Sequence, residues 1–177
     1  MNAVINLGYR HLDTAWLYKN EEVIGEAIKD ILEKSEGKIT RADLFITTKI
    51  WITQYGNPQE ELLGSLKRLG VDYVDLYLIH WPAQYFGEHR KPLHVLWAEL
   101  EALVDAGYTK SLGLSNFNVQ LICDLLCYAR VKPVCNQVEL HPYCAQSELV
   151  RFLLDQHIIP VAYCPLGRPA AAEDPGN

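Results

Sequence analysis

The sequence lacks several features that would mark other classes of protein. No apolar run among its 177 residues approaches the roughly 20 residues that a membrane-spanning helix needs. The first ten residues, MNAVINLGYR, contain neither the basic region nor the long apolar block of a secretion signal. The formal net charge of −6 also lacks the basic excess that is typical of nucleic-acid-binding proteins. We therefore expect neither a membrane nor a nucleic acid as a partner.

Cysteine is scarce, and its spacing disfavours the usual cysteine-based sites. The five cysteines form no CxxC pair and no spacing that is typical of a zinc site, so we expect no metal. Cys123 and Cys127 lie one helical turn apart among leucines and an isoleucine, and we expect both to be buried by packing. An odd number of cysteines without a secretion signal fits a reducing compartment, which predicts a cytoplasmic location.

A glycine-rich GxGxxG fingerprint is also absent, which disfavours a Rossmann dehydrogenase. The sequence instead repeats a short apolar run followed by an amphipathic segment, with a period of roughly 25 to 35 residues that is typical of parallel βα units. A parallel barrel needs about eight strands, so six predicted strands indicate either an open sheet or an incomplete barrel. The predicted strands are 11–15, 43–50, 71–80, 110–117, 134–140 and 159–165, and the predicted helices are 20–34, 57–70, 94–107, 118–131 and 147–158, with Asn20 and Ser147 among the expected N-caps.

Polar side chains stand where three of the predicted strands give way to loops. Asp13 and Tyr18 follow the first strand, Lys49 lies near the end of the second, and His80 closes the third. Because the carboxyl ends of parallel strands meet at one face of a barrel, we expect these four side chains to lie together. An ammonium would lower the pKa of a phenol, a carboxylate would hold the ammonium, and an imidazole would orient an oxygen that the phenol protonates. Taken singly, each residue also has a structural explanation, such as a strand-end carboxylate or a core histidine.

Four segments of the sequence resemble signatures of the aldo-keto reductase family. They are GYRHLDTAWLYKNEEVIG at 8–25, KSLGLSNF at 110–117, NQVELHPY at 136–143 and VAYCPLG at 161–167. The resemblance implies an α/β fold, a parallel (β/α)8 TIM barrel that is incomplete here because the first and eighth strands are missing. It also implies an oxidoreductase that reduces a small-molecule aldehyde or ketone to an alcohol with NADPH.

The resemblance assigns roles to individual residues of this sequence. It implies that Tyr18 is the general acid, that Asp13 pairs with Lys49, and that His80 orients the substrate. Cys164 stands where relatives commonly have a serine. The other residues that it implies are Ser115, Asn116 and Gln137 at the nicotinamide carboxamide, Tyr163 stacked on the nicotinamide, Leu166 near the pyrophosphate, and Trp51 and Trp81 as walls of an apolar substrate pocket.

Several further properties are expectations of the same resemblance. We expect one partial barrel domain at 1–167 and a disordered tail at 168–177. Unpaired strand edges predict self-association. The residues with which the family binds the adenosine phosphate are expected to lie outside this chain. Cofactor binding by this polypeptide alone is therefore predicted to be weak, and the choice between NADPH and NADH stays open. A catalytically inactive or regulatory relative is the alternative to an active enzyme.

Overall fold

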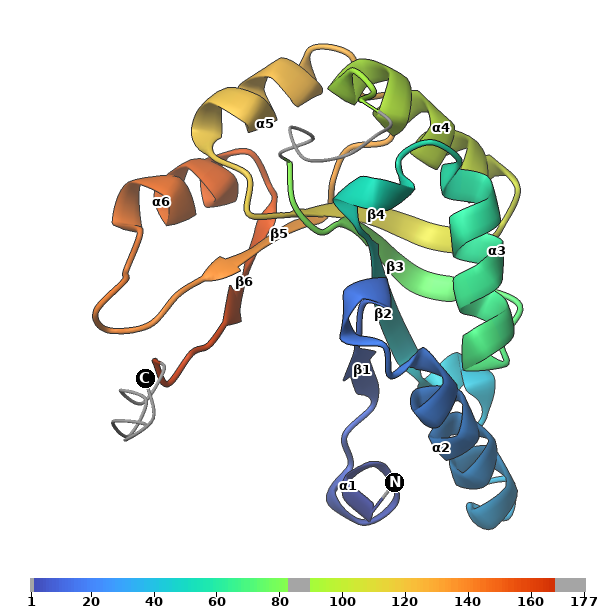
Figure 1. The fold of residues 1–177 in the computed structure, drawn as a ribbon. Coiled ribbons are helices and arrows are strands. Elements are labelled where there is room, and N and C mark those ends of the chain that lie inside the picture. Colours follow the sequence, from blue (N-terminus) through green and yellow to red (C-terminus); the bar gives the residue numbers. More distant parts are fainter. Residues whose placement is uncertain (1, 83–89, 168–177) are drawn as a thin grey trace, which may run out of the picture.

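The computed structural model describes residues 2–82 and 90–167 of the chain, along which helices and strands alternate (Figure 1). A short 3₁₀ turn, Trp16–Tyr18, follows the first strand. The helices are α1 (Asn2–Leu7), α2 (Glu21–Lys34), α3 (Pro58–Leu69), α4 (Leu93–Asp105), α5 (Val119–Leu126) and α6 (Ser147–Asp155). The strands are β1 (His11–Asp13), β2 (Phe45–Ile50), β3 (Val74–Ile79), β4 (Thr109–Ser115), β5 (Cys135–Glu139) and β6 (Ile159–Tyr163).

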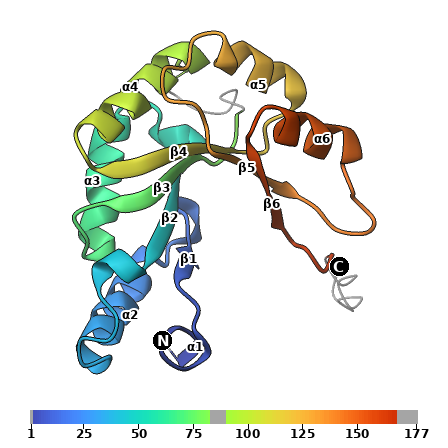
Figure 2. The same cartoon turned by 180° about the vertical axis from the view of Figure 1, so that it is seen from behind.

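The six strands form one sheet in which each strand pairs, in parallel, with its neighbours in the sequence. The order is β1-β2-β3-β4-β5-β6. The sheet is curled, and the helices α2 to α6 run along its outer side, as the two opposite views agree (Figures 1 and 2). This arrangement confirms the predicted parallel barrel architecture, of which the described residues contain six strands.

The main hydrophobic core lies between the sheet and the outer helices. Alternate residues of β3 point to opposite faces of the sheet, because side chains along a strand alternate. Tyr77 and Ile79 belong to the main core together with Trp97 of α4. Leu76 and Leu78 belong instead to a second, smaller cluster that includes Cys135 of β5. Burial on both faces explains why this strand is apolar apart from Asp75, whose buried carboxylate pairs with Arg41 and Lys110.

The ends of α3 agree with the sequence prediction. The side chain of Asn57 accepts a hydrogen bond from the amide of Glu60, and Pro58 occupies the first turn of the helix. Gly70 ends the helix with a φ of 65°, a left-handed conformation that glycine adopts without a steric penalty. The amide of Leu121 likewise donates to the side chain of Asn118 at the start of α5.

Other predicted helix ends are wrong in detail. Ser147 is the first residue of α6 rather than its cap, because Gln146 holds the cap position with a φ of 42°. Asn20 holds the N-cap position of α2 as predicted, but its side chain accepts from the Thr14 hydroxyl at 2.7 Å and makes no capping bond to the helix. Helix α5 ends at Leu126, well short of the predicted end at residue 131. The backbone of Val131 instead bonds to α4: its carbonyl oxygen accepts from the Trp97 indole, and its amide donates to the Glu101 carboxylate.

The predicted burial of Cys123 and Cys127 is also wrong, because both side chains are exposed. The buried stripe of α5 consists of Ile122 and Leu125, and the two cysteines lie on the other side of the helix. The predicted domain boundary at residue 167 stays a prediction, and the predicted tail at 168–177 lies outside the described residues. Among the described residues, no helix is both long and apolar enough to cross a membrane.

Candidate functional site

The structure brings the four strand-end residues together. Asp13 is the last residue of β1, Lys49 the penultimate residue of β2, and His80 directly follows β3. Tyr18 ends the 3₁₀ turn after β1. The Lys49 ammonium nitrogen lies 5.1 Å from the centroid of the Tyr18 ring, and the rings of Tyr18 and His80 are 5.5 Å apart in an edge-on contact. All four therefore gather at the carboxyl ends of adjacent strands.

The side chain of Lys49 is fully buried and is held by two acceptors. Its ammonium donates to Oδ1 of Asp13 and, at 2.9 Å, to the carbonyl oxygen of Thr14. Burial lowers the pKa of Lys49, and the Asp13 carboxylate opposes that shift. The side chain of Asp13 remains 35% exposed, and its second oxygen, Oδ2, accepts from Nε2 of Gln137 at 2.9 Å.

The pKa of Tyr18 is raised, which is opposite to the expected effect of a neighbouring ammonium. Partial burial is the largest cause, and the negative charge of Asp13 adds to it, because both disfavour the phenolate. The ammonium of Lys49 is already paired with that same carboxylate, so its charge does not act alone on the phenol. The Tyr18 hydroxyl consequently stays protonated at neutral pH.

His80 is neutral at physiological pH. Burial, followed by the positive charge of Lys49, lowers the pKa of the imidazole to about 4, while Asp13 acts in the opposite direction. The ring of Trp51 contacts it edge-on at 5.1 Å between centroids. Nδ1 of His80 is buried and has no hydrogen-bond partner within 2–82 and 90–167.

Buried polar contacts hold the turn that carries Tyr18, and of the residues that make them sequence reasoning singled out only Asn20, as a helix cap. Thr14 is buried and bonds to Asn20 across the turn. Glu21 is also buried and accepts from the Thr48 hydroxyl at 2.6 Å and from the Arg68 guanidinium at 2.8 Å. Glu21 thus connects the end of the turn both to β2 and to α3. The only sign of these contacts in the sequence was the pattern Tyr-x-Asn-Glu, which places the polar residues directly after Tyr18.

The residues expected at the nicotinamide also lie together. The Ser115 hydroxyl donates to the carbonyl oxygen of Gln137 at 2.8 Å, and Asn116 has a φ of 64°. The Asn116 amide donates to the Ser115 hydroxyl and to the carbonyl oxygen of His80, both at 3.0 Å. The Tyr163 hydroxyl donates to Oδ1 of Asn116 at 2.9 Å. This chain of hydrogen bonds links the ends of β3, β4 and β6 to the middle of β5.

A cavity of about 370 Å³ lies where these groups converge. Trp51 and Trp81, the predicted pocket walls, are among its lining residues, and so are Leu17 and Cys164, for which no role was predicted. Leu17 directly precedes Tyr18, and Cys164 directly follows Tyr163. This adjacency to predicted site residues was the only indication in the sequence that either would line the cavity. Leu166 is 96% exposed and is not among the lining residues, so the structure does not bring it to the other candidates. The complete lining is Leu17, Tyr18, Trp51, His80, Trp81, Ser115, Asn116, Gln137, Tyr163 and Cys164.

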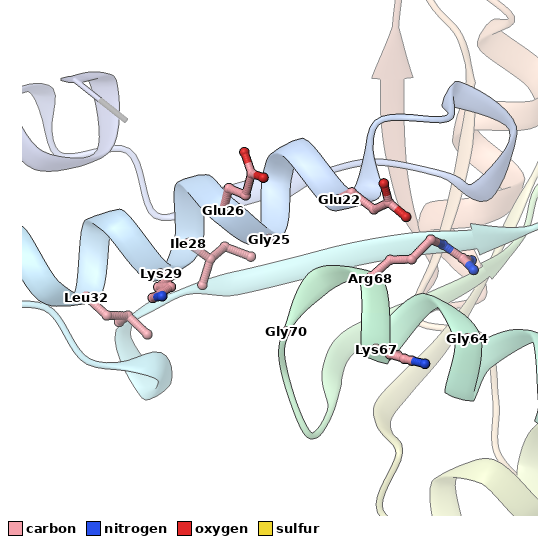
Figure 3. A pocket seen from close by; sticks show the side chains of 10 residues that line it. All are labelled: Glu22, Gly25, Glu26, Ile28, Lys29, Leu32, Gly64, Lys67, Arg68 and Gly70. Atoms are coloured by element: carbon pink, nitrogen blue, oxygen red, sulfur yellow. The ribbon is translucent and has the colours of Figure 1, made fainter.

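A larger hollow, of about 770 Å³, lies elsewhere, between α2 and the end of α3 (Figure 3). The two helices approach closely there, because a Cβ atom on Gly25 would lie 2.4 Å from the carbonyl oxygen of Arg68. Its charges are mixed, with Glu22 and Glu26 facing the same hollow as Lys67. We interpret it as a seam of helix packing. Among the described residues, no group of three or more His, Cys, Asp or Glu side chains could hold a metal ion.

Comparisons with known proteins agree with this geometry. The sequence matches the Aldo/keto reductase family over residues 1–174. It is 40% identical over 191 residues to "Aldose reductase C" of Dictyostelium discoideum, a match that covers 95% of this chain and 58% of the relative. The chain thus spans little more than half the length of that relative.

Solved structures with the same fold give the same result. The aldose reductase of Giardia lamblia superposes with a TM-score of 0.89 at 36% identity, covering 94% of this chain and 60% of that one. An aldo-keto reductase of Bombyx mori, in complex with NADP, gives 0.87 at 36% identity and covers 97% and 57% of the two chains. Since the family match extends over almost the whole sequence, the chain belongs to the aldo/keto reductase family.

Proposed function

We propose that this chain carries the active site of an oxidoreductase that reduces aldehydes or ketones to alcohols with NADPH. The observation that supports this most is the convergence of a protonated phenol and a neutral imidazole on one cavity at the strand ends, with a buried Lys–Asp pair beside the phenol. A carbonyl that accepts hydride at its carbon needs a proton at its oxygen, and a positioned phenol can supply it.

Tyr18 is the proton donor in this proposal. Its raised pKa keeps the proton on the hydroxyl until the carbonyl oxygen becomes basic, which happens as the carbon receives hydride. The phenolate that forms is then stabilised by the ammonium of Lys49, which lies 5.1 Å from the ring centroid. Asp13 acts through Lys49, because it holds the ammonium in place.

His80 orients the substrate. With a pKa of about 4 its imidazole is uncharged, so it can donate a hydrogen bond to the carbonyl oxygen without competing with Tyr18 as an acid. Trp51, Trp81 and Leu17 form apolar walls of the cavity and favour substrates with aromatic or alkyl bodies.

NADPH is the proposed cofactor, since the Bombyx mori relative was crystallised with NADP. Ser115, Asn116 and Gln137 would hold its carboxamide, and Tyr163 would stack on the nicotinamide ring, since all four line the cavity and three carry amide or hydroxyl groups that suit a carboxamide. The bound cofactor would supply the hydride. NADH is left as an alternative that the same nicotinamide contacts would accept.

The test is turnover of p-nitrobenzaldehyde with NADPH, measured as loss of cofactor absorbance. We expect Tyr18→Phe to lower kcat by about 10²- to 10⁴-fold. Tyr143→Phe removes the same hydroxyl from a side chain that is 96% exposed, and it is the matched control. Equal rates for Tyr18→Phe and the control would reject Tyr18 as the acid.

A catalytically inactive or regulatory protein is the second candidate, and it predicts no turnover even by the unmodified chain. Quenching of tryptophan fluorescence by NADPH separates the two ways of being inactive, because Trp51 and Trp81 line the cavity. Quenching without turnover would indicate a binding protein. The absence of both, at NADPH concentrations high enough for the weak binding expected of this chain, would reject the proposed site.

Three further properties belong to the proposal. We propose self-association through the edges of β1 and β6, each of which pairs with a single strand among the described residues. Dilution monitored by light scattering tests it. The free state of all five cysteines supports a cytoplasmic location, which cell fractionation would check. We also propose that residues 1–167 form one partial barrel domain, which limited proteolysis would test.

A further inference from the structure

Helix α5 presents two thiols on the side that faces solvent. Cys123 and Cys127 are exposed, as is Asp124 between them, whereas Ile122 and Leu125 are buried against the core. Neither cysteine lines the strand-end cavity. The two thiols therefore have no part in packing the helix and none in the proposed reduction.

The two cysteines lie on one helix face, and the Cys127 thiol is directed toward the turn that carries Cys123. Residues four apart in an α-helix have Cβ atoms about 5 to 6 Å apart. Helical backbone continues through Cys127, which has a φ of −68° and a ψ of −26°. Its sulfur lies 3.2 Å from the carbonyl oxygen of Cys123, to which the thiol donates. The Cys127 side chain is thus directed back along the helix toward Cys123.

This spacing is unsuitable for a disulfide but suits a shared ion. A disulfide needs Cβ atoms roughly 3.5 to 4.5 Å apart, which the helix does not allow without unwinding. An ion bound at about 2.3 Å from each of two sulfurs can bridge thiolates that are up to about 4.6 Å apart. The pair therefore stays a dithiol that can chelate.

The number of donors selects the class of ion. Structural zinc sites take four protein ligands, and the described residues offer no group of three or more His, Cys, Asp or Glu that could hold a metal ion. Two thiolates alone suit a soft ion that accepts two ligands, and Cu⁺ is among the metals that thiolates select. The Asp124 carboxylate, which accepts from the Tyr128 hydroxyl at 3.1 Å, adds negative charge on the same helix and attracts a cation.

We propose that Cys123 and Cys127 form a bidentate thiolate site for a soft monovalent cation of the Cu⁺ class. Binding forms two metal–sulfur bonds and releases the two thiol protons, so the bound pair carries one net negative charge. No electron is transferred. The weak hydrogen bond from the Cys127 thiol to the Cys123 carbonyl is lost when that proton leaves. This site goes beyond the proposed carbonyl reduction and does not depend on it.

The test is competition between the full chain and bicinchoninate for Cu⁺, under anaerobic conditions with ascorbate as reductant. We expect the chain to take one equivalent of Cu⁺ from the chelator. Cys123→Ser and Cys127→Ser should each weaken binding by about 100-fold or more, because the second thiolate then no longer acts at high effective concentration.

Cys144→Ser and Cys164→Ser are the matched controls, since both residues are free cysteines outside α5. They should leave the affinity unchanged. Native mass spectrometry should show a mass increase of one copper less one proton on the unmodified chain, as expected for a monovalent ion, and circular dichroism should show that the serine variants remain folded. Retention of the Cu⁺ affinity by Cys127→Ser, or its loss in Cys164→Ser, would overturn the proposal.

Discussion

Gln137 donates a hydrogen bond of 2.9 Å from Nε2 to Oδ2 of Asp13, although 124 residues separate the two in the sequence. Strands β5 and β1 are not neighbours in the sheet, so this bond crosses the concave side of the curled sheet. The other oxygen of Asp13 accepts from Lys49. One carboxylate therefore receives donors from both β2 and β5, and Gln137 supports the Lys–Asp pair in addition to its proposed place at the nicotinamide.

Replacing Gln137 with glutamate should destabilise the chain in a pH-dependent way. The variant places a second carboxylate against Asp13, which raises the pKa of the pair in the folded state. The folded protein then binds a proton more readily than the unfolded chain, so the penalty is largest at neutral pH and falls as the pH drops through the carboxyl range. We expect Gln137→Glu to lower the free energy of unfolding in urea by about 1 to 2 kcal/mol at pH 7, and by less at pH 4.5.

Gln120→Glu is the control for that change, because Gln120 lies on the exposed side of α5. A carboxylate in the first turn of a helix interacts favourably with the helix dipole, so no loss of stability is expected there. If the two variants unfold at the same urea concentration at pH 7, the hydrogen bond between Gln137 and Asp13 has no energetic role.

The pKa of His80 should move in opposite directions when either member of the Lys–Asp pair is removed. Lys49 lowers this pKa and Asp13 raises it. Lys49→Met should therefore raise the value above about 4, and Asp13→Asn should lower it further. The chemical shifts of the imidazole protons in an NMR titration give the His80 pKa in each variant. Shifts of the same sign in the two variants would mean that a general change in burial, rather than the pair's charges, controls His80.

The low pKa of His80 also predicts how stability depends on pH. The folded-state value is about 4, against an ordinary 6.5, so the unfolded chain binds more protons between these values. Stability associated with His80 is therefore fully present above pH 6.5 and is lost as the pH falls toward 4. After allowance for the partial exposure of the ring, we expect a loss of about 1 to 2 kcal/mol.

His80→Gln should remove that part of the pH dependence. Urea unfolding of the variant and of the unmodified chain at pH 7 and pH 4.5 measures how much stability each loses between these pH values. The difference between the two losses is due to His80, because the carboxylates titrate equally in both proteins. An equal loss of stability in the variant and the unmodified chain would assign the pH dependence to those carboxylates.

The sequence predicted the strands and the site for the same physical reason. Continuous apolar runs indicate strands that are buried on both faces, and the carboxyl ends of such strands meet at one edge. The places of Asp13, Lys49 and His80 follow from this rule once the strands are located. The bond between Gln137 and Asp13 does not, because it depends on how strongly the sheet curls.

The errors in the sequence predictions also have physical causes. The direction of the pKa shift of Tyr18 depends on burial and on the pairing of Lys49 with Asp13, and both are properties of the folded chain. Cys123 and Cys127 were assigned to the wrong side of α5, because leucines flank them in the sequence while only the buried Ile122 and Leu125 define the packed stripe. Local sequence neighbours do not determine which side of a short helix faces the core.

Two glycines at the seam between α2 and α3 differ in what an added side chain would meet (Figure 3). A Cβ on Gly25 would lie 2.4 Å from the backbone oxygen of Arg68, which cannot move without shifting α3. A Cβ on Gly64 would lie 3.2 Å from Nη1 of the same residue, a side-chain atom that can give by the few tenths of an ångström required without a shift of the backbone. Gly25→Ala should therefore lower the free energy of unfolding by about 2 to 3 kcal/mol. Gly64→Ala should leave it unchanged or raise it by up to about 1 kcal/mol through helix propensity.

Because α2 follows soon after Tyr18 and is tied to Arg68 through Glu21, displacement of α3 should also lower turnover in Gly25→Ala but not in Gly64→Ala. Equal stability of the two variants in urea would contradict the close backbone contact on which this argument depends.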